Sequence, residues 1–127
     1  MGKAGLGASV IDAGALIAFE RLDRRARAAF RERTGPLIIP APVLAQVWRD
    51  GARQVLLARL VQAQGTVVEP LDSARAKAAG VLLGRSGTSD VVDASVVLSA
   101  RSHKAVVLTS DPEDLRRIDP DVAIEVV

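Results

Sequence analysis

The sequence predicts an α/β fold in which one mainly parallel sheet carries helices on both faces. Three observations indicate this fold: the length, the composition and the order of the expected elements. The 127 residues suffice for one domain with a real hydrophobic core. Hydrophobic residues make up 49% of the chain and aromatic residues only 2%, so the core must consist mainly of Val, Leu, Ile and Ala. Short apolar runs alternate with segments of helical periodicity, as in repeated strand–helix units.

The expected strands are short apolar runs that end at polar or helix-breaking residues. They cover residues 8–11, 37–39, 66–69, 105–108 and 123–126. Asp12 ends the first run, and Pro40 and Pro70 follow the second and third. These ends are important because ligands of open α/β sheets bind beyond the carboxyl ends of the strands, where the strand order reverses.

The expected helices lie between these strands. They cover residues 13–20, 22–33, 42–48, 52–64, 72–83, 90–102 and 111–118. Gly84 is expected to end the fifth helix, and Asp90 to cap the start of the sixth. The sequence contains no internal repeat, linker or low-complexity segment, so we expect a single domain over residues 1–127.

Composition excludes several classes of site. The chain has no cysteine, which excludes disulfides, cysteine-type zinc sites and thiol nucleophiles. Ser9 and Ser95 have no convincing histidine partner for a serine hydrolase, and no phosphate-binding glycine loop occurs. No apolar run reaches the roughly 18 residues of a membrane helix, and the first ten residues lack a signal-peptide core. We therefore expect a cytoplasmic protein with no membrane partner.

Positive charge gathers in one part of the chain. The net charge is only +2, yet six arginines lie within residues 21–33. Such a segment suits an acidic partner such as nucleic acid or an acidic protein. It also describes a solvated helix face on which Glu20, Asp23 and Glu32 are counter-charges, and charge alone favours this second interpretation.

Four aspartates stand where the fold would bring them together. Asp12 follows the first strand and Asp111 the fourth, whereas Asp90 and Asp93 share one face at the start of a helix. Gathered carboxylates repel one another, and a divalent cation relieves that repulsion. Oxygen ligands favour Mg²⁺ or Mn²⁺, which can hold a phosphate oxygen and activate water. The set indicates phosphodiester hydrolysis, although Asp is also common at strand ends and helix N-caps.

Four segments, taken in order, resemble the PIN-domain ribonucleases. The family's first strand and first acidic residue resemble SVIDAGALIAF at 9–19, and its strand-to-helix turn resembles PAPVLAQVW at 40–48. Its central acidic helix resembles SDVVDASVVLSA at 89–100, and its last strand with a Thr/Ser-x-Asp signature resembles VVLTSDPEDL at 106–115. The length is typical of VapC-type toxins of VapBC toxin–antitoxin modules. The resemblance implies a three-layer α/β/α sandwich with a central sheet of four to five strands.

The resemblance implies a role for each matching acidic residue. Asp12, Asp93 and Asp111 would be the catalytic carboxylates around Mg²⁺ or Mn²⁺. Asp90 would be a further metal ligand or would support the ligands from behind.

Three other positions complete the implied site. Thr109 or Ser110 would orient the acidic cluster through hydrogen bonds. The family usually has a Glu where this chain has Gln46, which keeps an oxygen ligand but loses the negative charge. Glu20 or Asp50 are candidate replacements for that charge.

The implied function is a metal-dependent endoribonuclease toxin that cuts RNA, forms a homodimer and is silenced by a VapB-like antitoxin. Gln46 supports an alternative, a degenerate PIN domain that binds RNA or a protein without cutting. The last alternative is a phosphoacceptor signalling domain. It would need an acceptor Asp after the third strand, which instead ends at Glu69, and a Lys after the fourth, where Thr109 and Ser110 stand.

Single residues outside the acidic set carry weaker expectations. The only histidine, His103, is expected on the surface and not as a base. Trp48 would stack on a base or, more commonly for a lone Trp, lie in the core or an interface. Apolar residues amid the arginines predict a groove for an amphipathic antitoxin segment, although some of them must pack on the sheet. These residues are Leu16, Phe19, Leu22 and Phe30.

Overall fold

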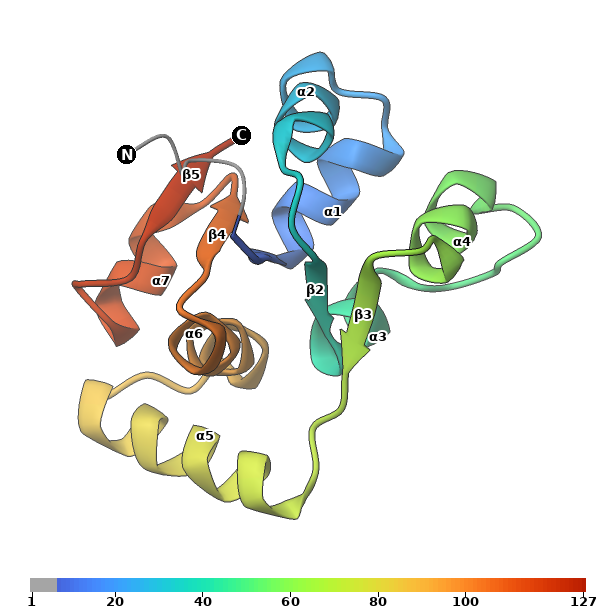
Figure 1. Cartoon of the computed structure of the whole chain (residues 1–127). Helices are drawn as coiled ribbons and strands as arrows, with labels where there is room; N and C mark the ends of the chain where they lie inside the picture. The colour runs from blue at the N-terminus through green and yellow to red at the C-terminus, as the bar shows by residue number, and fades with distance from the viewer. Residues whose placement is uncertain (1–6) are drawn as a thin grey trace.

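A computed structural model describes residues 7–127, and residues 1–6 of the expected domain lie outside the described part. The described chain builds one five-stranded sheet in the order β3-β2-β1-β4-β5 (Figure 1). All four neighbouring pairs are parallel, which confirms the expected sheet. The strands are β1 (Ser9–Ile11), β2 (Leu37–Pro40), β3 (Thr66–Glu69), β4 (Val106–Thr109) and β5 (Ile124–Val126).

Helices cover the sheet on both sides. They are α1 (Ala13–Glu20), α2 (Arg24–Glu32), α3 (Ala41–Val47), α4 (Val55–Gln62), α5 (Ser73–Ser86), α6 (Val91–His103) and α7 (Pro112–Ile118). Figure 1 shows α1 and α2 on one side of the sheet and α5 and α6 on the other, which gives the expected three layers. The path from β1 to β3 steps one way along the sheet, and β4 to β5 steps the other way. The strand order therefore reverses between β1 and β4.

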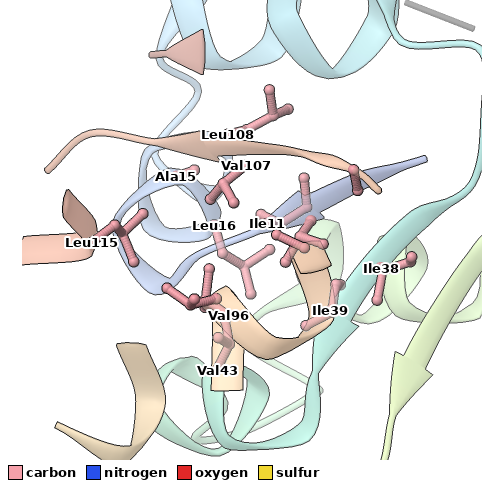
Figure 2. Packing of buried hydrophobic residues seen from close by; sticks show 14 of the residues in the cluster. Ile11, Ala15, Leu16, Ile38, Ile39, Val43, Val96, Val107, Leu108 and Leu115 are labelled. Carbon is pink, nitrogen blue, oxygen red and sulfur yellow. The ribbon is translucent and has the colours of Figure 1, made fainter. Parts of the chain in front are cut away.

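The core lies around the central strand. All three residues of β1 are buried, since the strand has a neighbour on each side and helices on both faces. Figure 2 shows Ile11 of β1 and Leu16 of α1 among residues of the neighbouring elements, including Val96 of α6 and Leu108 of β4. A strand buried on both faces needs no polar alternation, which explains the continuous apolar runs in the sequence.

The expected helix boundaries are correct to within two residues, except at two ends that each differ by three. The fifth helix continues through Gly84 to Ser86 and ends at Gly87, whose φ of 69° is the left-handed conformation that glycine adopts most easily. The fourth helix begins at Val55, because the preceding residues form a turn instead. In this turn the Gln54 side chain accepts the backbone N–H groups of Arg49, at 2.6 Å, and Asp50, at 2.9 Å.

The expected groove of four apolar residues in the α1–α2 region is wrong for two of them. Leu16 and Phe30 are buried core residues. Phe19 is half-buried and stacks on Phe30 with ring centroids 4.7 Å apart. Only Leu22 is strongly exposed, at 59%, in the turn between the helices. The stacking could not be foreseen because it depends on the angle at which the two helices meet.

Glu69, at the carboxyl end of the edge strand β3, joins three elements. Its carboxylate accepts hydrogen bonds from Arg75 of α5 at 2.6 Å and from Ser99 of α6 at 2.5 Å. The exposed His103 ring lies 2.5 Å from the other carboxylate oxygen, so this surface residue has a partner that its sequence neighbourhood did not reveal. Burial by itself would raise the pKa of Glu69, but these hydrogen bonds and the nearby positive charge outweigh it and lower the pKa.

We expect Glu69→Gln to lower the free energy of unfolding by about 1–3 kcal/mol at pH 7, because it weakens three charge-assisted hydrogen bonds. A carboxyl group whose pKa is lowered by folding stabilises the protein above its unfolded pKa, and this contribution is lost as the pH falls through the folded value. The difference between wild type and variant should therefore shrink below about pH 4. Urea unfolding at pH 7, 5 and 4 measures it.

Glu113→Gln is the matched control, because Glu113 forms an exposed ion pair with Arg116 at 3.0 Å. Its loss should be within about 0.5 kcal/mol. Equal losses for the two variants, or a Glu69→Gln loss that does not change with pH, would contradict the proposed role of Glu69.

Candidate active site

Asp12 is held in place from two directions at the end of β1. Its carboxylate caps α1 by accepting the backbone N–H of Ala15 at 2.8 Å. The other carboxylate oxygen accepts a hydrogen bond from the hydroxyl of Thr109, at the end of the neighbouring strand β4. The backbone N–H of Asp12 donates to the carbonyl of Leu108 at 3.2 Å, which continues the β1–β4 ladder past the strand. Asp12 is thus a buried carboxylate with a fixed position.

Thr109 connects this carboxylate to the turn that precedes α7. While its hydroxyl donates to Asp12, the same oxygen accepts the backbone N–H of Asp111 at 2.9 Å. Thr109 is fully buried and lies where an orienting residue would have to be. Ser110 is exposed and lies instead against Gly14 of α1, where a side-chain Cβ would collide with its hydroxyl.

Asp90 and Asp93 reach the same region from the start of α6. The exposed Asp90 caps the helix by accepting the backbone N–H of Asp93 at 3.0 Å. Asp93 is half-buried, and burial is the main reason that its pKa rises to about 7. The negative charges of Asp90, Asp114, Asp12 and Asp111 raise this pKa further, in that order. The four expected aspartates therefore interact electrostatically across three segments of the chain.

Asp114 is an acidic residue that the sequence analysis missed. Interaction with the Asp114 carboxyl group is the main reason that the pKa of Asp111 is raised. Asp111 and Asp114 have the same spacing at the start of a helix as Asp90 and Asp93. Applying the same-face argument to both pairs would have found Asp114.

A cavity of about 270 Å³ opens beside these carboxylates. Its lining comprises Thr88, Ser89, Asp90, Asp93, Asp114, Arg117 and Ile118. Arg117 adds a positive charge at this wall and lies 3.6 Å from the carboxylate of Asp114. The cavity therefore combines acidic groups with hydroxyl groups and one guanidinium, all of them able to contact a polar, charged ligand.

Gln46 lies apart from the described interactions of the cluster. It is exposed on α3, and the hydrogen bonds and ion pairs within residues 7–127 do not include it. The two candidate replacements for the missing negative charge, Glu20 and Asp50, do not act on the cluster. Asp50 belongs to the α3–α4 turn, where it forms an ion pair with Arg53 at 3.8 Å, and neither it nor Glu20 contributes to the raised pKa of Asp93.

The donor set fits a hard divalent cation by its chemistry. Carboxylate oxygens are the ligands that Mg²⁺ and Mn²⁺ prefer, and a cation would relieve the repulsion that raises the pKa of Asp93. The side chains do not form a complete set of metal ligands. Within residues 7–127, no three acidic or histidine side chains are arranged to hold a metal. Each carboxylate oxygen of Asp12 accepts one hydrogen bond, from Ala15 or from Thr109, and keeps a lone pair for an ion.

The match to a family model decides the relationship of this chain to known proteins. The model of the PIN domain matches residues 9–120, which include all five aspartates of the cluster. The chain belongs to the PIN-domain family. The resemblance seen in the sequence is thereby confirmed, and the sheet order with its switch between β1 and β4 is the PIN-like α/β fold.

Two solved structures share the fold of this PIN domain. One is FitAB bound to an IR36 DNA fragment, with a TM-score of 0.65 at 18% identity, covering 93% of this chain and 94% of the other. The second is VapBC2 from Rickettsia felis bound to a DNA fragment from its promoter, with a TM-score of 0.72 at 12% identity, covering 94% and 98% of the two chains. The comparison with curated proteins finds no significant match. Among residues 7–127, no helix has both the length and the apolar character needed to cross a membrane.

We expect Asp93→Asn to raise the free energy of unfolding of the metal-free protein by about 1–2 kcal/mol at pH 8, because it removes a half-buried charge near four others whose repulsion solvent partly screens. Folding raises the pKa of Asp93, so this gain should vanish as the pH falls below the unfolded value of about 4. Millimolar Mn²⁺ should stabilise the wild type but not Asp93→Asn. Thermal unfolding with and without Mn²⁺ measures both effects.

Asp72→Asn, at the exposed N-cap of α5, is the control for the loss of one negative charge. It should leave the response to Mn²⁺ unchanged. A Mn²⁺ response that survives in Asp93→Asn would place the cation elsewhere.

Proposed function

We propose that this PIN domain is a metal-dependent endoribonuclease, the VapC-like toxin of a type II toxin–antitoxin pair that acts in the cytoplasm. The observation that carries the proposal is the electrostatic interaction of Asp93 with four other aspartates near the sheet edge between β1 and β4, where burial and then these charges raise the pKa of Asp93 to about 7. A fold keeps such mutual repulsion where a positive ligand is to be bound.

Asp12, Asp93 and Asp111 would hold Mg²⁺ or Mn²⁺, with Asp90 and Asp114 at the side of the site. A divalent ion there would stabilise charge on the phosphate and on attacking water. Thr109 and the Ala15 N–H orient Asp12 so that a ligand oxygen stays in place. Arg117 offers a positive charge to a phosphate oxygen at the wall of the cavity. These groups suit hydrolysis of an RNA phosphodiester bond.

The alternative is a PIN domain that binds RNA or a protein without cutting, and Gln46 is the feature that favours it. Against it stands the cluster itself, since a binding domain gains nothing from a half-buried carboxylate among four others. Phosphoacceptor signalling loses its support with the PIN-family match.

We expect the purified protein to cleave single-stranded RNA in the presence of Mn²⁺ or Mg²⁺ and to lose at least about 100-fold in rate in Asp12→Asn. Asn keeps the ability to cap α1 but not the charge. Gln46→Glu should raise the rate several-fold if this position reaches the ion, since it adds a negative ligand. Cleavage of a fluorescent RNA measures all three proteins.

Undiminished cleavage by Asp12→Asn would reject the site. RNA binding with no metal-dependent cleavage by the wild type or by Gln46→Glu would support the non-catalytic alternative instead.

We further propose an antitoxin partner and a homodimer. The solved neighbours are two-component complexes, FitAB and VapBC2, and Leu22 is the exposed apolar residue in the arginine-rich α1–α2 region. An exposed apolar residue in an arginine-rich segment suits an amphipathic, acidic segment of an antitoxin.

We expect Leu22→Glu to weaken capture of a co-expressed antitoxin from the neighbouring gene at least tenfold while stability changes little, because Leu22 is 59% exposed. Val81→Glu, at a residue 55% exposed on α5, is the control for an added surface charge. Co-purification and fluorescence titration measure the effect. Equal capture of both variants would remove Leu22 from the interface.

A further inference from the structure

A groove runs from the acidic cluster along one side of α1. It has a volume of about 440 Å³ and is lined by Gly14, Ile17, Ala18, Arg21, Asp23 and Ser110. Four of these residues belong to α1 or its C-cap, at positions that recur every three or four residues and so form one face of the helix. Ser110, from the turn between β4 and α7, forms part of the opposite wall.

The Gly14 end of the groove lies beside the carboxylate of Asp12. A Cβ atom at this position would lie 3.7 Å from the carboxylate oxygen of Asp12 and would collide with the hydroxyl of Ser110. The absence of a side chain at Gly14 leaves room for the Ser110 hydroxyl, which lies between the groove and the buried aspartate.

Arg21 supplies the positive charge at the far end. It is exposed at the C-cap of α1, and none of the ion pairs within residues 7–127 involves it. The neighbouring carboxylate of Asp23 is engaged by α2, because it accepts the backbone N–H of Ala26 at 2.9 Å as the helix N-cap. The guanidinium is thus available to an anion, while the nearest carboxylate is tied to the positive end of a helix.

The spacing suits a nucleic-acid strand. Gly14 and Arg21 are seven residues apart, which is about 10 Å along a helix. Between them Ile17 and Ala18 provide an apolar floor. A strand whose scissile phosphate lies at the cluster would place a sugar or base over this floor and a following phosphate near Arg21. Polyanion binding at a guanidinium and base contact on apolar carbon are the usual elements of single-strand recognition.

We propose that this groove binds the single-stranded RNA segment flanking the scissile phosphate, and that Arg21 is the positioning residue that holds its backbone phosphate. The proposal rests on the proposed ribonuclease function and names where its substrate lies. An acidic peptide from a protein partner would be the other occupant that an arginine could attract. RNA is favoured because the Gly14 end of the groove lies beside Asp12, one of the carboxylates proposed to hold the catalytic ion.

The test measures RNA binding apart from cleavage. A labelled single-stranded oligoribonucleotide of mixed sequence is titrated with Asp12→Asn protein in Mg²⁺, and with the same protein carrying Arg21→Ala. We expect about tenfold weaker binding and a fall of about one in the slope of log K against log salt, as for loss of one phosphate contact. In otherwise wild-type protein, Arg21→Ala should raise KM more than it lowers kcat.

Arg85→Ala is the matched control, since Arg85 is exposed in the last turn of α5, on the other side of the sheet. It should change neither the RNA affinity nor the salt slope. Unchanged RNA binding by Arg21→Ala, or equal losses in the two variants, would overturn the proposal. So would unchanged RNA binding with weaker capture of the co-expressed antitoxin, which would assign the groove to a protein.

These outcomes separate the groove from the catalytic proposal. If the wild type fails to cleave RNA but Arg21→Ala still weakens RNA binding and lowers the salt slope, the groove stands and the nuclease function falls. If cleavage is metal-dependent but insensitive to Arg21→Ala in both KM and RNA affinity, the nuclease function stands and the groove falls.

Discussion

The site depends on the pairing of β1 with β4, at the point where the strand order of the sheet reverses. This pairing continues one residue beyond β1, where the Asp12 N–H donates to the Leu108 carbonyl. It brings the Asp12 carboxylate beside the Thr109 hydroxyl, although the two residues are 97 positions apart. The starts of α1, α6 and α7 contribute acidic residues to the same edge. Their positive N-terminal ends favour negative charge, so the topology offsets part of the cost of gathering carboxylates.

The helix ends offset only part of the repulsion among the carboxylates, and the remaining repulsion contributes to the raised pKa of Asp93. Asp12 keeps two hydrogen bonds that favour its charged form, whereas burial outweighs them and raises its pKa. Burial, and after it four neighbouring negative groups, raise the pKa of Asp93 to about 7. In the same protein Glu69 is surrounded by donors and its pKa is lowered. Glu69 and the aspartates therefore have opposite roles. Glu69 joins the edge strand to α5 and α6, whereas the aspartates form a negatively charged region suited to a cation.

Local sequence pattern predicted most of the strand and helix limits. It could not predict contacts between residues that lie far apart in the sequence. The first strand, the helix over residues 13–20 and the third strand were located correctly because their polar or helix-breaking limits stand in the sequence. Gly84 was wrongly taken as a helix end because glycine ends a helix only where the backbone turns left-handed, as at Gly87. Asp114 was within reach of the spacing argument and was overlooked. The partner of His103 lies 34 residues away in another element, and no local pattern reports it.

The sequence by itself determined the fold class, the family and four of the five aspartates of the site, because periodicity, turn residues and ordered motifs are local properties of the chain. The tertiary structure alone decided how those residues interact. It ties Asp12 to Thr109, pairs Asp111 with Asp114, leaves Gln46 exposed on α3 and opens a groove from Gly14 to Arg21. Each of these relations depends on the angle and register at which separate elements pack. Burial and charge, which set the pKa of each carboxyl group, exist only after that packing is complete.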